Sequence, residues 1–268
     1  MAPGLDVACH AIAMTARHAL VTGAARGIGA ATATKLAEDG FQVLCLDLCS
    51  DIAALDYPMG TFDELSAVVD ACGADAAGAV GDVRDRESLV DAIEGRTFDV
   101  VVCAAGAVWG GPPIWETPPQ TWAEILAVNL DGVVNTAAVT VSAMLAANNP
   151  GRFVAIASAA ADRGLPRMGA YSAAKHGVAG VIRSMAGDLA GSQITANAVS
   201  PGSTASAILN ASAAIYDLAD SSEFAQHHTN GRLLEPAEIA NAIAWLCSDA
   251  ASAVTGSVMA VDGGMTAT

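Results

Sequence analysis

The sequence predicts an α/β protein: a single domain built on a doubly wound parallel sheet of about seven strands, with helices on both faces. Short apolar runs alternate along the chain with longer segments of helical pattern, an order typical of parallel sheets. The 268 residues contain no Pro/Ser-rich linker, charge block or composition break that would separate two domains. Hydrophobic residues make up 53% of the chain and aromatic residues only 4%, which favours close packing of helices on a sheet through small side chains.

Each predicted strand is a short apolar run, as expected for strands that are buried on both faces of a sheet. The helices between them carry apolar residues at helical spacing and end at breakers such as Gly40. The predicted strands cover residues 18–22, 42–47, 77–81, 98–103, 152–158, 194–199 and 256–261. The predicted helices cover residues 30–39, 62–71, 85–94, 117–147, 170–190 and 235–248, and residues 203–232 form a mobile helical lid before the last helix.

The first strand is followed by TGAARGIG, residues 22–29, which leads directly into the first helix. Glycine permits a tight turn and lets the backbone approach a pyrophosphate, while a helix N-terminus offers free N–H groups and a positive dipole end. The spacing is TGxxxGxG rather than GxGxxG, but the strand–turn–helix context is the one that a nucleotide site requires. We therefore expect a nucleotide to bind here, with an ordinary glycine-rich turn as the alternative.

Asp47 ends the second predicted strand, eighteen positions after Gly29. A carboxylate about 20 residues beyond such glycines binds the adenosine ribose hydroxyls and repels a 2′-phosphate. Arg26 is the opposing feature, because a basic residue in the turn could pair with that phosphate. We favour Asp47, since Arg26 can turn to solvent, and we expect NAD as the cofactor.

Residues 49–60, CSDIAALDYPMG, exceed the 2–6 residues that usually connect a strand to a helix. The segment is too apolar for a disordered linker, so we expect it to fold down near the adenosine end of the site. After the third strand, Asp82 could lie against the adenine, or it could be the N-cap of the next helix.

Tyr171 and Lys175 are four positions apart, which places them on one face of a helix, and Ser158 lies at the end of the fifth strand. A free phenol has a pKa of about 10, and a nearby positive charge favours its ionised form. Tyr171 could therefore exchange a proton with a substrate whose oxygen Ser158 holds. The YxxxK pair alone is a weak signal, because it also occurs by chance on amphipathic helices.

Two further segments accompany this trio. Asn129 lies inside the long helix, in the run VNLDG, so it either has a polar partner or lies exposed on the surface. Residues 200–204, SPGST, follow the sixth strand, and small residues at the carboxyl edge of a sheet allow close approach to a ligand.

Composition excludes several classes of protein. The net charge of −16 and the pI of about 4.4 argue against nucleic acid or an anionic membrane as a partner, because both need a basic surface. Six cysteines lie without CxxC or Cys/His pairing, so we expect reduced thiols, no structural zinc and a cytoplasmic protein. The adjacent His227 and His228 do not share a helix face, and we expect no metal site. The N-terminus lacks the order of a signal peptide, and no apolar segment is expected to reach the roughly 18 residues of a membrane span.

TGAARGIG, VNLDG, Ser158 and YxxxK, in this order and over nearly the whole chain, resemble the short-chain dehydrogenase/reductase family. The resemblance implies a Rossmann-type fold and hydride transfer between a secondary alcohol or ketone and NAD. More narrowly, CSDIAALDYPMG, WETP, ASAAADRGLPRMGAYSAAKH, SPGST and AWLCSDAASAVTGSV resemble the mycofactocin-dependent subfamily. That likeness implies an insertion at about 49–60 that covers a tightly held NAD, with the redox carrier mycofactocin as electron acceptor.

The resemblance also implies roles for individual residues. Tyr171 would be the general acid/base, Lys175 would lower its pKa and bind the nicotinamide ribose, and Ser158 would orient the substrate oxygen. Asn129 would hold a relay water against Lys175. The remaining residues would contact the cofactor: Gly23, Gly27, Ile28 and Gly29 at the pyrophosphate with Arg26 beside them, Asp47 and Leu48 at the ribose, Asp82 and Val83 at the adenine, Ala105 and Gly106 in the turn after the fourth strand, and Pro201, Gly202 and Thr204 at the nicotinamide.

The family usually has NNAG after the fourth strand, where this chain has CAAG at 103–106. The missing Asn should weaken a sheet contact more than the chemistry. Trp109, Ile114, Leu165 and the lid are the expected pocket walls, which favours an apolar secondary alcohol or ketone as the small-molecule substrate. Family members are commonly homotetramers, and the two longest helices would form the interface.

Two other hypotheses remain open from the sequence. An ordinary member of the family would exchange NAD freely and would be purified without it. A regulatory nucleotide-binding protein would have kept the fold and lost catalysis, although the presence of all four catalytic-type residues argues against this.

Overall fold

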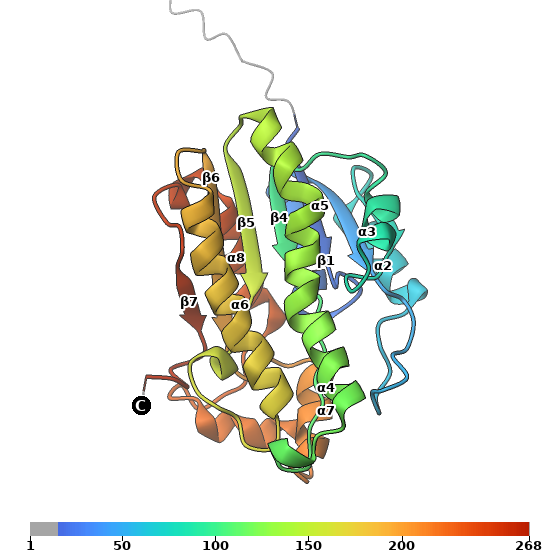
Figure 1. Cartoon of the computed structure of the whole chain (residues 1–268), viewed down its shortest axis with the longest axis vertical. Helices are drawn as coiled ribbons and strands as arrows, with labels where there is room; N and C mark the ends of the chain where they lie inside the picture. The colour runs from blue at the N-terminus through green and yellow to red at the C-terminus, as the bar shows by residue number, and fades with distance from the viewer. Residues whose placement is uncertain (1–15, 268) are drawn as a thin grey trace, which may run out of the picture.

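A seven-stranded parallel sheet runs through the centre of the computed structural model, which describes residues 16–267 (Figure 1). The strand order is β3-β2-β1-β4-β5-β6-β7, so the predicted doubly wound α/β fold is confirmed. The strands are β1 (His18–Thr22), β2 (Gln42–Asp47), β3 (Ala77–Val80), β4 (Val100–Cys103), β5 (Gly151–Ile156), β6 (Ile194–Pro201) and β7 (Val258–Val261). The α-helices are α1 (Gly27–Glu38), α2 (Phe62–Cys72), α3 (Arg86–Ile93), α4 (Pro119–Leu126), α5 (Gly132–Ala147), α6 (Gly169–Asp188), α7 (Ala207–Ile215) and α8 (Pro236–Cys247).

The helices form two layers, with α5 and α6 in front of the sheet and α8 behind it in the view of Figure 1. Successive strand residues point to opposite faces of a sheet. In β1, Leu20 therefore belongs to the core shared with α3, α5 and α6, whereas Ala19 and Val21 belong to the core shared with α1, α2 and α8. This burial on both sides explains why the strands are continuous apolar runs.

The order of the strands reverses between β1 and β4, and open α/β sheets bind ligands outside the carboxyl ends of the strands at such a point. Thr22, the last residue of β1, pairs with Cys103, the last residue of β4. The Thr22 Oγ1 atom accepts a hydrogen bond from the N–H of Ala105 (3.4 Å). The fold thus brings the turn after β1 and the turn after β4 side by side at one edge of the sheet.

The predicted helix 117–147 begins at Pro119 and contains one π-helical turn, η2 (Ala127–Asp131), between α4 and α5. By length and composition, Pro119–Ala147 is apolar enough to cross a membrane, with a mean hydropathy of 1.4. The prediction that no segment reaches this length is therefore wrong. In this fold the helix packs against α3, α6 and β4, as a core helix of an α/β protein does.

The cysteines of the described residues are unpaired, in agreement with the predicted reduced thiols: Cys45, Cys49, Cys72, Cys103 and Cys247. Cys9 lies outside the described residues, as does most of the segment on which the prediction about a signal peptide rests.

Candidate active site

A cavity of about 590 Å³ lies along the carboxyl ends of the strands. It extends from the glycine turn after β1, past the ends of β2 and β3, to α6 and the segment after β6. The structure brings every predicted site residue to its wall: Gly23, Arg26, Gly27, Ile28, Gly29, Asp47, Leu48, Asp82, Val83, Ala105, Gly106, Asn129, Ser158, Tyr171, Lys175, Pro201, Gly202 and Thr204. Residues from eight separate segments of the chain therefore face one space.

The glycine turn after β1 leaves no room for a side chain at Gly23 or at Gly29. Gly23 has a φ of +67°, and a Cβ there would lie 2.5 Å from the backbone of Ala105. A Cβ on Gly29 would lie 1.9 Å from the carbonyl oxygen of Gly23. Helix α1 begins at Gly27 with no side chain capping its first N–H groups and no acidic residue in its first turn. The turn presents bare backbone and a positive helix end to the cavity, which fits the pyrophosphate of a dinucleotide.

Asp47 lies at the cavity wall with its carboxylate held by backbone amides. Its Oδ2 atom accepts a hydrogen bond from the N–H of Ala25 (3.0 Å), and its Oδ1 atom accepts one from the N–H of Cys49 (3.3 Å). A carboxylate fixed in this way fits the ribose of a nucleotide. Arg26 does not turn freely to solvent as expected, because its Nη2 atom donates to the carbonyl oxygen of Pro58 in the insertion (2.6 Å).

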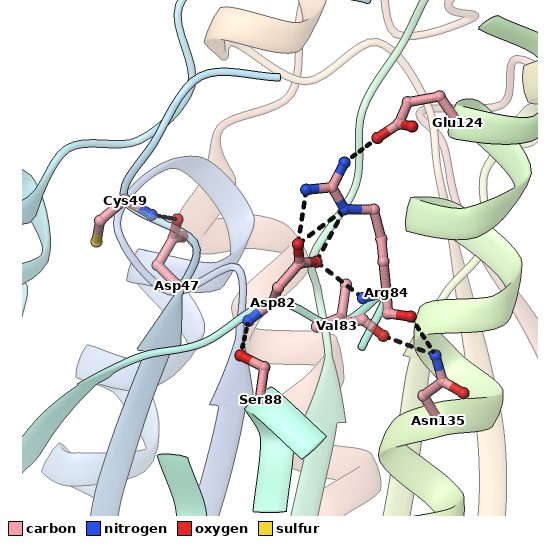
Figure 2. A network of polar contacts seen from close by, with 8 residues as sticks. All are labelled: Asp47, Cys49, Asp82, Val83, Arg84, Ser88, Glu124 and Asn135. Carbon is pink, nitrogen blue, oxygen red and sulfur yellow. Dashed lines mark hydrogen bonds and ion pairs between the residues drawn. The ribbon is translucent and has the colours of Figure 1, made fainter. Parts of the chain in front are cut away.

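Asp82, after β3, is paired with Arg84 (Figure 2). The Nη2 atom of Arg84 donates to the Asp82 carboxylate at 2.6 Å, and Nη1 donates to Glu124 on α4. Burial alone would raise the pKa of Asp82, but the hydrogen bonds and the charge of Arg84 outweigh it and hold the pKa below its ordinary value. The cap of α3 is Asp85, so the alternative that Asp82 caps this helix is wrong.

Sequence reasoning missed three residues that fix the segment after β3: Arg84, Glu124 and Asn135. The Nδ2 atom of Asn135, on α5, donates to the carbonyl oxygens of Val83 (2.9 Å) and Arg84 (3.2 Å), as Figure 2 shows. Asn135 is buried inside a helix. The sequence offered one signal for it, a polar residue within an apolar helical segment. The pair of Arg84 and Glu124 joins positions 40 apart and leaves no local signal.

The insertion at 49–60 folds down as predicted, and it reaches further than the adenosine end. Ile52, Leu55 and Met59 are buried in one cluster with Ile125 and Val128. The partly buried ring of Tyr171 packs against the same cluster, which places the insertion beside the proposed catalytic residues as well.

A polar contact fixes the centre of the insertion. The Tyr57 hydroxyl oxygen accepts a hydrogen bond from the N–H of Val108 (2.9 Å), in the segment after β4. Ile52, Met59 and Gly60 line the cavity, so the insertion forms part of its wall.

Asn129 is fully buried in the π-helical turn, so the alternative of an exposed surface Asn is wrong. Its Nδ2 atom donates to the carbonyl oxygens of Ala107 (2.8 Å) and Ile125 (2.9 Å). A Cβ on Gly106 would lie 3.2 Å from Oδ1 of Asn129 and 3.8 Å from Nζ of Lys175. Asn129 and Lys175 therefore approach the same position, Gly106, and the amide oxygen also accepts a hydrogen bond from the N–H of Ala107 (3.3 Å).

Lys175 lies one turn after Tyr171 on α6, and its Nζ atom is 5.6 Å from the centre of the Tyr171 ring. Nζ donates to the carbonyl oxygen of Ile156 at the end of β5 (2.8 Å). Burial lowers the pKa of Lys175 to about 8. Burial raises the pKa of Tyr171 to about 12, although the Ser158 hydroxyl acts in the opposite direction. The expected lowering of the Tyr171 pKa by Lys175 is therefore not seen in the protein alone.

Ser158 lies just after β5, where its side chain caps the short helical turn η3 (Ala159–Ala161). Its Oγ atom accepts a hydrogen bond from the N–H of Ala160 (3.1 Å), and its carbonyl oxygen accepts one from Oγ of Ser200 (2.6 Å). Both contacts fix the hydroxyl at the cavity wall, close enough to Tyr171 to influence that phenol.

The segment 203–232 covers the other end of the cavity with α7 and the short helix η4 (Ser221–His227). The Tyr216 hydroxyl donates to the carbonyl oxygen of Pro166 (2.7 Å), and Asp217 pairs with Arg167 (3.0 Å). The lid was expected to form a pocket wall, and apolar side chains of this segment line the cavity: Ile208, Leu209, Leu218 and Phe224.

Of the other pocket walls expected from the sequence, Leu165 lines the cavity, whereas Trp109 and Ile114 do not. Trp109 packs into the cluster beneath the insertion. Ile114 lies against the position of Gly169, where a Cβ would come within 2.6 Å of it. The prediction was wrong for these two residues, because Trp109 packs against apolar side chains of the insertion cluster and Ile114 is half exposed at the surface.

Known proteins resemble this chain over nearly its whole length. The family model described as enoyl-(acyl carrier protein) reductase matches residues 23–266. Cis-4-hydroxycyclohexanecarboxylate dehydrogenase of Sinomonas cyclohexanicum is 38% identical, covering 95% of this chain and 98% of that protein. (-)-trans-Carveol dehydrogenase of Rhodococcus erythropolis is 35% identical, covering 92% and 96%. The crystal structure of carveol dehydrogenase from Mycobacterium avium in complex with NAD is 29% identical, with a TM-score of 0.90, and covers 95% of this chain and 99% of that one.

The fold, the cavity and these relatives define an NAD(P)-dependent oxidoreductase that acts on alcohols or ketones. The chain belongs to the short-chain dehydrogenase/reductase family, as an alcohol dehydrogenase or ketoreductase.

Proposed function

We propose that the protein transfers hydride between a secondary alcohol or ketone and NAD, with Ser158, Tyr171, Lys175 and Asn129 as its catalytic residues. The observation that carries this proposal is that these four side chains meet the glycine turn at one cavity wall. A protein that only bound a nucleotide would have no need of such a set, which argues against a purely regulatory role.

In the direction of oxidation, a bound NAD supplies the hydride acceptor. As the alcohol carbon loses hydride, its hydroxyl proton passes to Oη of Tyr171, and the O–H electron pair forms the carbonyl bond. Ser158 donates a hydrogen bond to the substrate oxygen. Because burial raises the pKa of Tyr171 to about 12, the phenolate needs a positive charge beside it, and Lys175 supplies one when protonated. Asn129 holds its amide oxygen next to that ammonium, where a relay water would bind.

The cofactor contacts proposed here follow the wall of the cavity. Asp47 supports NAD over NADP, because its fixed carboxylate would face a 2′-phosphate. The other proposed contacts are Gly23, Gly27, Ile28 and Gly29 with Arg26 beside them at the pyrophosphate, Leu48 at the ribose, Asp82 and Val83 at the adenine, Ala105 and Gly106 in the turn after β4, and Pro201, Gly202 and Thr204 at the nicotinamide.

The insertion at 49–60 supports a finer proposal, in which NAD is held tightly and is reoxidised in place by mycofactocin. Ile52, Leu55 and Met59 are buried, and Arg26 of the glycine turn is tied to Pro58. A cofactor beneath such a cover could leave only if part of this cluster opened. An external electron carrier would then be needed for each turnover.

An apolar alicyclic secondary alcohol is the substrate class that we propose. The lid contributes Ile208, Leu209, Leu218 and Phe224 to the cavity, and apolar walls of this kind bind apolar ligands. Relatives named for carveol and for hydroxycyclohexanecarboxylate, both ring alcohols, support the same class.

We also propose a cytoplasmic homotetramer that assembles through the helix from Pro119 and through α6. Val134 and Leu145 are large apolar side chains exposed on α5, which supports an interface there. Sedimentation or light scattering would measure the assembly, and a monomer at micromolar concentration would contradict it.

The proposed reaction can be tested without added nucleotide. Purified protein is mixed with a panel of alicyclic secondary alcohols, and the near-ultraviolet absorbance of reduced nicotinamide is followed in a single turnover. An artificial electron acceptor is then added to allow repeated turnover. Ser158→Ala serves as the matched control, since it removes the hydroxyl and keeps the fold. No reduction with any alcohol, with or without added NAD, would contradict the proposal.

A further inference from the structure

His228 is a buried side chain with two hydrogen bonds that together define its protonation. Its Nε2 atom accepts from the backbone N–H of Ser203 (2.9 Å), and its Nδ1 atom lies 2.6 Å from the carbonyl oxygen of Arg232. A backbone N–H can only donate and a carbonyl oxygen can only accept. The ring must therefore be neutral, with its proton on Nδ1. Only 4% of the residue is exposed.

The ring clamps the segment that follows β6. A Cβ on Gly202 would lie 2.8 Å from Nε2 of His228, so backbone and ring are in close contact. On the other side, the N–H of Leu234 donates to the carbonyl oxygen of Ser203 (3.0 Å), and Thr204 and Leu234 form a parallel bridge. Gly202, Ser203 and Thr204 line the cavity, so the clamp holds part of its wall.

The charged groups on the neighbouring segments are engaged elsewhere. The Asp262 carboxylate, after β7, accepts hydrogen bonds from Gly264 and Thr266. The Arg232 guanidinium, on the same segment as the ring, binds Glu238 of α8. A protonated His228 would turn an N–H toward the N–H of Ser203, and that contact would be lost.

We propose that neutral His228 is a positioning residue for hydride transfer, which fixes Gly202–Thr204 by accepting a hydrogen bond from Ser203. The inference rests on the proposed function, since that function puts these residues beside the nicotinamide. It adds a residue 24 positions beyond Thr204 to the machinery of the site.

Two substitutions separate the two hydrogen bonds of the ring. His228→Gln places an amide oxygen near the position of Nε2 and keeps an acceptor for Ser203. His228→Asn places an amide N–H near the position of Nδ1 and keeps a donor for Arg232, but leaves Ser203 without an acceptor. We expect kcat to fall about tenfold or more in His228→Asn, the size of effect that an unpaired buried N–H produces, and to stay within about twofold in His228→Gln. His18→Gln, at the exposed start of β1, is the control.

A second readout is independent of kcat. Backbone amide exchange at Ser203, which needs no turnover, should be faster in His228→Asn than in wild type or His228→Gln. Equal kcat in the Gln and Asn variants, or unchanged exchange at Ser203 in His228→Asn, would overturn the proposal. Failure of the proposed function would appear differently. Wild type would then show no turnover, but amide exchange at Ser203 would still be faster in His228→Asn than in wild type.

Discussion

The insertion at 49–60 and the lid at 203–232 cover two ends of one cavity, and different forces hold them. The insertion is anchored by the buried side chains of Ile52, Leu55 and Met59, each worth about 1.5–3 kcal/mol. The buried apolar side chains of the lid, among them Leu209 and Phe224, pack with one another. Polar contacts tie the lid across the cavity, among them an ion pair whose Asp217 side chain is 79% exposed. Exposed ion pairs contribute only about 0–1 kcal/mol.

This difference matches the two ligands of the proposed reaction. A cover held by apolar burial resists opening, which suits a cofactor that stays bound. A cover held by exposed polar contacts opens at small cost, which suits a substrate that must enter and a product that must leave in every cycle. Substitutions that loosen one cover at a time test this difference.

The largest effect is expected from Tyr171→Phe, because Tyr171 is the proposed general acid/base and packs against the insertion cluster. Without its hydroxyl, turnover should fall by about 10²–10⁴-fold, the contribution typical of a general acid/base. Bound nucleotide should be retained, since the ring still packs against the insertion. Tyr216→Phe, which removes only a lid contact, is the control and should keep most of its turnover. Near wild-type turnover in Tyr171→Phe would contradict its role.

Ile52→Ala tests the anchor of the insertion. The side chain is 5% exposed, and removing it should cost about 2–4 kcal/mol of the free energy of unfolding. If the insertion retains the cofactor, nucleotide release should become faster in the same variant. Urea unfolding and stopped-flow release measure the two effects, with the exposed Asp56→Asn as control. A destabilised variant that releases nucleotide no faster would separate the insertion from cofactor retention.

Lys175 allows a test that involves neither cover, namely the pH dependence of the free energy of unfolding. Its side chain, on α6, is buried. Its pKa is about 8 in the folded protein, below the ordinary 10.5 that applies to the unfolded chain. Between these values the unfolded chain binds more protons, so the contribution of Lys175 to stability rises with pH. In protein stripped of nucleotide, wild type should gain at most about 3 kcal/mol over Lys175→Met between pH 7 and pH 10.5. A difference that falls with pH would mean that the ammonium is better stabilised than its burial implies.

Asp47→Asn tests the choice of cofactor beneath the insertion. The amide keeps an acceptor for Ala25 and removes the charge that opposes a 2′-phosphate, so preference for NAD over NADP should fall about tenfold. Binding constants for the two nucleotides measure this, with the exposed Asp70→Asn as control. Unchanged preference would assign selectivity to Arg26 or to the insertion.

The smallest effect is expected from Asp217→Asn in the lid. Loss of an exposed ion pair with Arg167 should change the free energy of unfolding by less than about 1 kcal/mol. KM for the alcohol should rise modestly, and nucleotide release should be unchanged. A loss of several kcal/mol, or faster nucleotide release, would mean that the two covers are not held as differently as their contacts indicate.

The sequence predicts the sheet edge better than it predicts the covers. Local sequence pattern sets where strands end and helices begin. The positions of Gly23, Asp47, Ser158 and Tyr171 could be predicted for this reason, and all four line the cavity. The need of Asn129 for a polar partner was visible, but the π-helical turn that buries it was not.

Contacts between distant loops could not be predicted. Trp109 was expected in the pocket and packs under the insertion instead, because the position of a loop side chain depends on what covers it. For the same reason, two contacts could not be predicted: the ion pair of Arg84 and Glu124, and the hydrogen bond from Ser203 to His228. No sequence pattern links the two residues of either contact. Local pattern fixes where the chain turns, and tertiary packing decides what meets there.

The most direct measurement is the nucleotide content of the protein purified and extensively dialysed without added cofactor. The protein is denatured, and any released nucleotide is identified by chromatography and absorbance. The account predicts near-stoichiometric NAD in wild type and clearly less in Ile52→Ala. Protein that is empty after dialysis but turns over with added NAD would contradict the tightly held cofactor. Protein that binds no nucleotide at all would contradict the site built on Gly23 and Asp47.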